Sequence, residues 1–434
     1  MSAFALRGRI AHCLRDPGPE NDPDAIEAFE DGVLLIEDGR VARLGPAEDV
    51  LKTLPETFPV THYDAHLIVP GFVDCHVHYP QVDVLASYGK QLLDWLNDYT
   101  FPSEARFADR AVADETARFF VDELLANGTT TALVFCTVHA HSVDALFEAA
   151  ARYNLRMGAG KVLMDRHCPE NLRDTAETGY RESRELIERW HGNGRAHYAI
   201  TPRFAPTSSE EQLRLAGELA NEFPDTLVHT HLAENPDEIA WVGELFPEAD
   251  DYLDVYNRAG LLRERSVFAH CIHLSDHEFT TMGRAGGAVA FCPTSNLFLG
   301  SGLFDLARAR THGVRVGLGT DIGGGTSFSL LRTGGEAYKV LQLQGQSLTG
   351  FRALYLATLG GAEALHLDDK IGSFRVGMEA DIAVIKTGGT PVAARRHAIA
   401  TSIEESLFVS LIVDGAQRIR ATYAMGREVM THDP

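Results

Sequence analysis

The pattern of apolar and polar positions at the two ends of the chain differs from the pattern in its middle. Near the amino end, residues 33–44 form two short apolar runs around an Asp-Gly pair, a turn that favours a β-hairpin. Towards the other end, residues 381–385 are strand-like, and residues 411–413 lead into a second Asp-Gly pair at 414–415. Both ends of the chain are therefore predicted to be β-rich.

Residues 66–365 follow a different pattern, in which short β-branched apolar runs alternate with longer segments of helical periodicity. The eight apolar runs occupy residues 68–78, 129–136, 156–165, 197–204, 226–234, 266–274, 287–295 and 315–322. Helical spacing is clearest at residues 109–127, 175–191 and 210–221.

Strand-like runs that alternate with helices in this number predict an α/β fold, a (β/α)8 barrel. We expect the barrel to be a catalytic domain over residues 68–368. The two β-rich ends, residues 1–67 and 369–434, are expected to pair into one small β-sandwich domain.

Composition narrows the range of partners. With 45% apolar and 23% charged residues, the chain has the composition of a globular protein. Its 39 Lys and Arg against 61 Asp and Glu give a net charge of −22. An acidic surface repels phosphate backbones and anionic lipid, so we expect neither a nucleic acid nor a membrane as partner. A small neutral molecule would not be repelled.

The cysteines and the hydropathy pattern predict a cytoplasmic protein. The 6 cysteines include no C-x-x-C pair, which is not a disulfide framework in a chain of this length. The first residues hold no apolar core of signal-peptide length, and no apolar run approaches the length of a membrane span.

Several unusual polar residues fall at the ends of the predicted barrel strands, where catalytic groups of this fold gather. His76 and His78 end the first run and share one face, because strand residues two apart point the same way. The fifth run holds His229 and His231, which periodicity cannot separate, while His270 lies on the sixth run and Asp321 ends the eighth. Imidazoles and a carboxylate that converge at a barrel mouth suit Zn²⁺ or Fe²⁺.

Other zinc hydrolase and nucleotide-binding signatures are absent. The sequence contains neither the H-x-E with P-C-x-x-C pattern of other zinc deaminases nor H-E-x-x-H. No G-x-G-x-x-G follows a strand and opens a helix.

The motifs P-G-F-V-D-C-H-V-H, H-L-A-E, A-H-C and G-T-D resemble the amidohydrolase superfamily in order and spacing, over nearly the whole chain. Within it, the residues after His78, the loop from Leu92 to Glu104, and Thr201-Pro202-Arg203-Phe204 resemble the guanine deaminases.

The resemblance implies roles for individual residues. They are His76, His78, His231 and Asp321 as zinc ligands, His270 beside the metal, and Gln81, Arg203 and Phe204 around a purine. Trp95 is a further candidate for stacking on the purine plane. The resemblance also implies a homodimer.

One metal ion per chain is expected, with Zn²⁺ preferred and Fe²⁺ possible. Superfamily members with two metals usually bridge them with a modified lysine at the end of the fourth strand. Here that strand ends in Arg203-Phe204, and Lys161 lies on the third run.

Two carboxylates are hypothesised to divide the proton transfers of a hydrolytic deamination. Asp321 would accept a proton from the attacking water, and Glu234 would protonate the ring nitrogen and relay a proton to the leaving amine. His270 would orient the nucleophile. Asn235 and Pro236 look like a helix start directly after Glu234, which would hold this carboxylate on a rigid edge.

Guanine is the expected substrate, with xanthine and ammonia as the products of a step in purine catabolism. An Arg203 guanidinium matches the adjacent acceptors O6 and N7, and it would reject a 6-amino purine, where donor faces donor. Gln81 could bind the N1–H and C6=O edge. The alternatives are a triazine, cytosine or an adenosine-derived base as substrate, or an inactive scaffold of the same fold.

Overall fold

The computed structural model describes residues 3–88, 91–413 and 419–432. The chain divides into two compact units. One consists of Met1–Val73, Asp122–Thr131 and Phe328–Pro434, and the other of Asp74–Val121 and Ala132–Ser327. The domain limits at residues 67/68 and 368/369 stay a prediction.

The two ends of the chain pair with each other, as predicted, and their strands form one seven-stranded sheet. Its strands are β1 (Ala3–Cys13), β2 (Ile26–Glu37), β3 (Arg40–Pro46), β4 (Val60–Pro70), β14 (Ile382–Lys386), β15 (Ile419–Ala424) and β16 (Arg427–Thr431). They run in the order β16-β15-β14-β4-β1-β2-β3, with antiparallel neighbours except for the parallel pair β1 and β4. The predicted hairpin is confirmed as β2 and β3. Asp38 and Gly39 between them both have positive φ, as a type I′ turn requires.

The strand expected at residues 411–413 is wrong. Leu411 and Ile412 end the helix α17 (Ile403–Ile412), and the Asp-Gly pair at 414–415 lies outside the described residues. Ser402 caps this helix and Glu404 and Glu405 occupy its first turn, a helix-start signal that outweighs the β-branched residues at its end.

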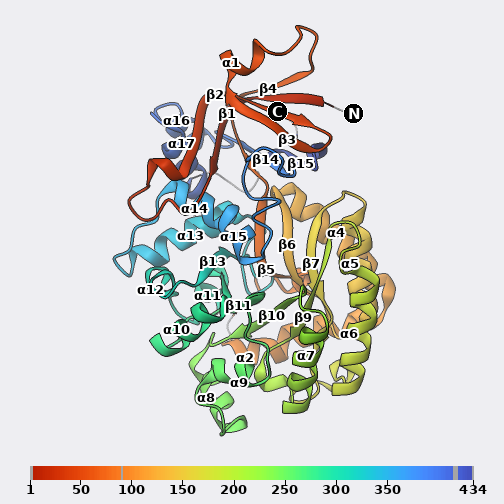
Figure 1. The fold of residues 1–434 in the computed structure, drawn as a ribbon. Helices are drawn as coiled ribbons and strands as arrows, with labels where there is room; N and C mark the ends of the chain where they lie inside the picture. The colour runs from red at the N-terminus through yellow and green to blue at the C-terminus, as the bar shows by residue number, and fades with distance from the viewer. Residues whose placement is uncertain (1–2, 89–90, 414–418, 433–434) are drawn as a thin grey trace. The chain divides into compact units, whose positions relative to one another are not determined.

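The predicted barrel strands are confirmed as a second sheet. They are β5 (Phe72–His78), β6 (Thr129–Phe135), β7 (Arg156–Gly160), β9 (Ala196–Pro202), β10 (Leu227–Leu232), β11 (Ser266–His270), β12 (Ala288–Phe291) and β13 (Arg315–Leu318). The sheet runs β13-β12-β11-β10-β9-β7-β6-β5, and the short β8 (Val162–Leu163) pairs with β9. The pairs from β9 to β13 are parallel, and β9, β10 and β11 lie side by side in Figure 1.

The two end strands of this sheet are joined by individual hydrogen bonds. The main-chain N–H of Asp321 donates to the carbonyl of His76 at 2.9 Å, and the N–H of His78 donates to the carbonyl of Ile322 at 2.9 Å. The buried Asp74 carboxylate accepts from the N–H of Thr320 at 3.0 Å and also bonds its hydroxyl. These contacts complete the barrel and bring the first and eighth strand ends together.

Helices alternate with the strands of the second sheet. The α-helices are α1 (Ala47–Leu51), α2 (Leu92–Trp95), α3 (Phe101–Ala105), α4 (Arg110–Ala126), α5 (Ala140–Ala151), α6 (Ala176–Trp190), α7 (Glu210–Glu222), α8 (Pro236–Leu245), α9 (Tyr252–Arg258), α10 (Asp276–Ala285), α11 (Pro293–Phe298), α12 (Leu306–Thr311), α13 (Leu330–Gln342), α14 (Gly350–Ala357), α15 (Leu359–Ala364), α16 (Pro391–His397) and α17. Short helical turns are η1 (Pro23–Ala25), η2 (Tyr79–Val84), η3 (Leu96–Thr100), η4 (Arg106–Ala108), η5 (Glu170–Leu172) and η6 (Ala205–Thr207).

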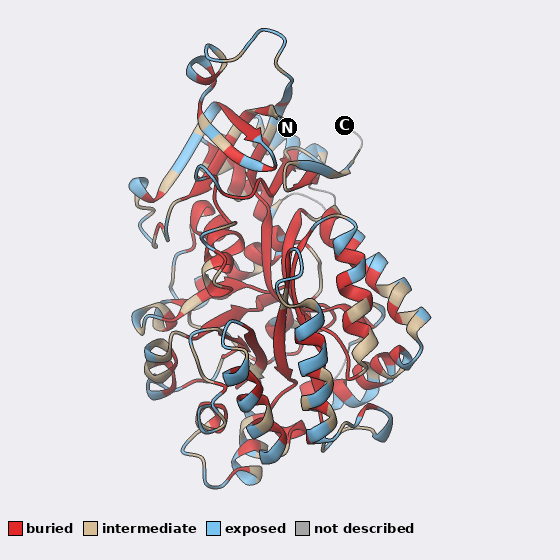
Figure 2. Ribbon diagram, turned by 45° about the vertical axis from the view of Figure 1, so that its right-hand side comes forward, coloured by how far each residue is buried: buried red, intermediate tan, exposed pale blue. Residues whose placement is uncertain are grey.

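The burial pattern follows these elements. Strands of the second sheet are almost entirely buried, whereas helices such as α6 and α7 alternate buried and exposed faces (Figure 2). Within the described part of the chain, no helix combines the length and the apolar character that crossing a membrane requires.

Candidate active site and metal centre

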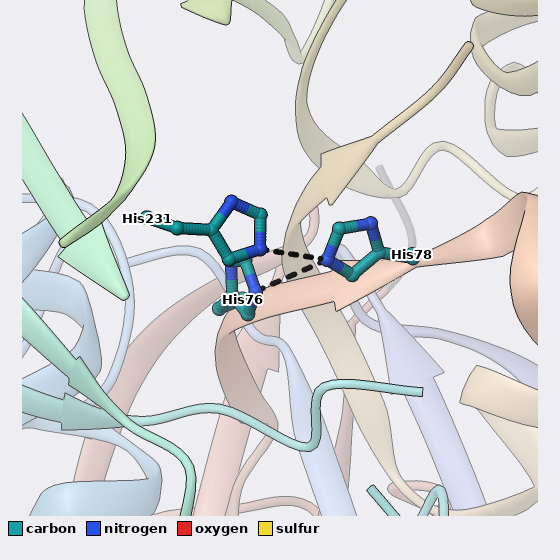
Figure 3. A group of neighbouring side chains, drawn as sticks. All are labelled: His76, His78 and His231. Atoms are coloured by element: carbon teal, nitrogen blue, oxygen red, sulfur yellow. Dashed lines mark hydrogen bonds between the residues drawn. The ribbon is translucent and has the colours of Figure 1, made fainter. Parts of the chain in front are cut away.

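Three imidazoles meet at the predicted strand ends. His76 and His78 on β5 point to the same side, and His231 on β10 faces them (Figure 3). The Nε2 atom of His78 lies 3.2 Å from Nε2 of His76 and 3.2 Å from Nε2 of His231. Period-two alternation places the first pair, and the order of the strands in the barrel places the third.

Asp321 adds an oxygen to this group. Its Oδ1 lies 3.2 Å from Nε2 of His76 and 3.4 Å from Nε2 of His78. A tetrahedral Zn²⁺ site with ligands at about 2.0–2.1 Å places its donor atoms about 3.3 Å apart. The spacing of these four donors therefore fits a single ion of this kind.

A hydrogen bond at Nδ1 fixes the tautomer of His231, with its lone pair on Nε2. Its Nδ1 contacts the main-chain carbonyl of Arg203 at 2.7 Å, and a carbonyl only accepts, so Nδ1 carries the proton. Burial lowers the pKa of His76, His78 and His231 well below the usual range, which keeps the imidazoles neutral. A neutral imidazole with a free Nε2 lone pair is the form that binds a metal.

His229, which periodicity cannot distinguish from His231, has a different position. Its Nε2 lies 2.8 Å from Nδ1 of His76, on the side of that ring away from the other ligands. It therefore orients a ligand instead of joining the group of donors. Among the described residues, the groupings able to hold a cation are His76, His78 and His231, and His76, His270 and Asp321.

His270 and Glu234 form the acid–base side of the site. Nε2 of His270 lies 3.4 Å from Oε2 of Glu234 and 3.8 Å from Oδ2 of Asp321, while its Nδ1 contacts Oδ1 of Asn296 at 2.9 Å. Burial acts to lower the pKa of His270, but the two carboxylates and Asn296 outweigh it and raise that pKa. Burial raises the pKa of Glu234 to about 7, and it also raises the pKa of Asp321.

The helix start after Glu234 is confirmed. Asn235 caps α8 with a capping box, in which the Glu238 side chain bonds back to the N–H of Asn235. The same carboxylate accepts from the N–H of Glu234 at 2.9 Å. Ser301 donates its hydroxyl to Oε1 of Glu234 at 3.1 Å. Glu234 is thus held from both its main chain and its side chain.

The predicted substrate side is a buried polar network. Nη1 of Arg203 donates to both oxygens of Glu104, at 2.9 and 2.8 Å. Nε2 of Gln81 donates to the same carboxylate at 3.1 Å, and its Oε1 accepts from the N–H of Gly323 at 3.2 Å. Arg203 therefore makes an ion pair, and it also lines the cavity beside the metal donors.

The segment from Leu92 to Glu104 is helical, so the expectation of a loop is wrong. It consists of α2, η3 and α3 in direct succession. Apolar residues give it a buried face, and Pro102 comes directly after the π-helical turn η3.

Apolar walls complete the cavity. Phe204 and Trp95 line it and belong to one buried cluster, and Nε1 of Trp95 donates to the carbonyl of Ser87 at 2.9 Å. The lining of the cavity joins the metal donors to the polar network. Its lining residues are His78, Gln81, Leu92, Trp95, Leu96, Arg203, Phe204, His231, Glu234, Glu238, His270, Leu299, Asp321 and Gly324.

The sequence argument gave no role in this site to Glu104, Ser301, Asn296 or Glu238. The capping box was the one available signal, since it places Glu238 beside the main chain of Glu234. Lys161 lies outside the site, buried in an ion pair with Asp174.

Comparison with known proteins shows similarity over nearly the whole chain. A guanine deaminase of Escherichia coli (strain K12) is 54% identical over 426 residues, which cover 98% of this chain and 97% of that protein. The solved structure of an E. coli guanine deaminase superposes with a TM-score of 0.97 at 53% identity, covering 99% of this chain and 100% of the other.

A more distant structure, the guanine deaminase from C. acetobutylicum with bound guanine in the active site, gives a TM-score of 0.89 at 29% identity. It covers 99% of this chain and 100% of that one. The profile of the Amidohydrolase family matches residues 67–429, which is most of the chain. With its barrel, its converging histidines and these relatives, the chain belongs to the amidohydrolase family.

Proposed function

We propose that this chain hydrolyses guanine to xanthine and ammonia. The observation that carries the proposal is one cavity whose lining includes metal-site residues, the Glu234 acid and the donors of Arg203 and Gln81. The likeness to guanine deaminases, at 54% identity over 98% of the chain, supports the same reaction.

A single Zn²⁺ held by His76, His78, His231 and Asp321 is part of this proposal. When bound, such an ion lowers the pKa of a water to about 7 and thereby supplies hydroxide at neutral pH. Fe²⁺ suits the same donors. The ion pair of Lys161 with Asp174 supports a single ion, since this lysine is engaged elsewhere.

The carboxylates of the site would carry the protons. Asp321 accepts a proton from the attacking water as the C2–O bond forms, and Glu234 donates its proton to ring N3. Asp321 then returns its proton to the amino group, directly or by relay through Glu234, and the C2–N bond breaks. The hydroxyl proton on C2 restores the acid form of Glu234, so one water is consumed and one ammonia released.

Recognition of guanine would depend on hydrogen-bond donors and on apolar rings that pack against the purine. Arg203 and Gln81 offer N–H groups to the oxo group and N7 of guanine, and Phe204 and Trp95 offer ring surface to the purine plane. His270, held at Nδ1 by Asn296, faces both carboxylates and would orient the nucleophile.

Oligomeric state and compartment complete the proposal. The family resemblance supports a homodimer, which size-exclusion chromatography with light scattering tests. Within the described residues the cysteines form no disulfide, which is consistent with a proposed reducing compartment such as the cytoplasm.

The decisive assay is ammonia release from guanine, cytosine, a melamine-like triazine and S-adenosylhomocysteine, with and without a chelator. We expect guanine to be turned over, and the chelator to abolish this activity. Preference for another base would replace the substrate, and no turnover together with no bound metal would indicate a scaffold protein.

A further inference from the structure

Glu104 is a fully buried carboxylate that contacts both polar recognition residues of the cavity. It lies on α3, and its oxygens accept from Nη1 of Arg203 at 2.8 and 2.9 Å and from Nε2 of Gln81 at 3.1 Å. Arg203 and Gln81 line the cavity, whereas Glu104 lies behind them. Its effect on a bound molecule is therefore exerted through these two side chains.

The contacts of Gln81 fix the orientation of its amide. A carboxylate only accepts hydrogen bonds and a main-chain N–H only donates, so Nε2 must face Glu104 and Oε1 must face Gly323. The second N–H of this amide is then the donor left for a ligand. With a neutral amide in place of the Glu104 carboxylate, only the N–H of Gly323 would still fix this orientation.

Arg203 is held on two sides by the same helix. Glu104 binds its Nη1, and the ring of Phe101 lies with its centroid 5.2 Å from the guanidinium carbon. Among the described residues, Nη2 of Arg203 has no hydrogen-bond acceptor. An unpaired guanidinium in so buried a place would be strongly unfavourable, and Glu104 offsets this cost while leaving Nη2 available.

We propose that Glu104 is a positioning residue that makes this wall of the cavity a pair of hydrogen-bond donors, and so sets its preference for a 6-oxo purine. The inference rests on the proposed function. An oxo group at C6 and the neighbouring N7 accept from such donors. A 6-amino group would meet them donor to donor, and a purine without a substituent at C6 lacks the acceptor altogether.

The test compares guanine with 2-aminopurine, which keeps the 2-amino group but lacks the oxygen at C6. In Glu104→Gln we expect kcat/KM for guanine to fall about 10- to 100-fold, the range for loss of a hydrogen bond to a charged group. The loss should lie mainly in KM. The inhibition constant of 2-aminopurine against guanine should change less than the KM for guanine, because only N7 of this ligand accepts from these donors and its C6 makes no hydrogen bond to lose. Metal content should not change.

Two further variants separate positioning from a merely structural role. Glu278→Gln alters a buried capping glutamate of α10 that does not line this cavity, and it should leave the ratio between the two ligands unchanged. In an Arg203→Met background, Glu104→Gln should have little further effect on guanine. Glu104→Asp keeps the charge with a shorter reach and should fall between wild type and Glu104→Gln.

The role of Glu104 would be overturned if both Glu104 variants kept wild-type affinity for guanine, or if guanine and 2-aminopurine lost affinity equally. Wild-type protein that releases no ammonia from guanine would instead overturn the proposed function, so the two failures are distinguishable.

Discussion

The metal side and the recognition side of one cavity are built from different kinds of element. His76, His78 and His231 stand on strands β5 and β10, whereas Glu104 stands on the short helix α3. The metal side consists of imidazoles that are neutral because burial lowers their pKa. The recognition side is an ion pair with an attached amide.

This contrast shows which interactions hold the metal-binding side chains and which hold the recognition side chains in place. Strand ends of a barrel hold donor atoms at fixed spacing because the neighbouring strands are joined by main-chain hydrogen bonds. The recognition side depends on side-chain pairing across separate segments, so one substitution there can reorient several groups. Substitutions on the metal side should therefore remove the reaction, and those on the recognition side should change its selectivity.

The largest effect is expected from His231→Ala. Removing this ligand should reduce the metal content from about one ion per chain to near zero and lower guanine turnover more than about 1,000-fold, because the nucleophile is lost. Elemental analysis and an ammonia assay measure both quantities.

His229→Asn is the matched control for that experiment. It removes a partner of His76 and not a ligand, so we expect the metal to remain, with affinity about 10- to 100-fold weaker. Loss of metal in this variant with retention in His231→Ala would reverse the assignment, and two tightly bound ions in wild type would contradict a single-ion site.

Glu234→Gln should have the next largest effect. The amide keeps the shape of the side chain but has no acidic proton, so we expect full metal content and turnover about 100- to 10,000-fold lower. Glu244→Gln, an exposed change on α8, the helix that follows Glu234, should behave as wild type. Near-wild-type turnover in Glu234→Gln would refute the proton-donor role.

The smallest predicted change is a shift in pH dependence. Burial raises the pKa of Glu234 to about 7, so the proton donor is present below that pH and kcat/KM for guanine should fall as the pH rises through about 7. The Ser301 hydrogen bond favours the carboxylate, so Ser301→Ala should raise this pKa and move the falling limb to higher pH.

The residual activity of Glu234→Gln provides the control for this pH effect, because it should lack that falling limb. If the fall of kcat/KM in Ser301→Ala occurs at the same pH as in the wild type, a group other than Glu234 causes it.

The sequence predicted the position of a side chain well wherever that position follows from strand periodicity or from local helix capping. His76 and His78 share a face because strands repeat every two residues, and Asn235 caps α8 through residues that follow it directly. Residues 92–104 were harder to interpret. Their turns are each too short to give a decisive helical pattern, and burial of an apolar face decides their conformation.

The sequence by itself determined the alternation of strands and helices, and with it the gathering of His76, His231 and Asp321 at one end of a barrel. Only the tertiary structure decided which partner each buried group has. Glu104 lies 99 residues before Arg203 in the chain, and no local pattern connects them. A buried polar group must find a partner wherever the packing places one, so the contact of His229 with His76 and the pairing of Arg203 with Glu104 are properties of the folded chain.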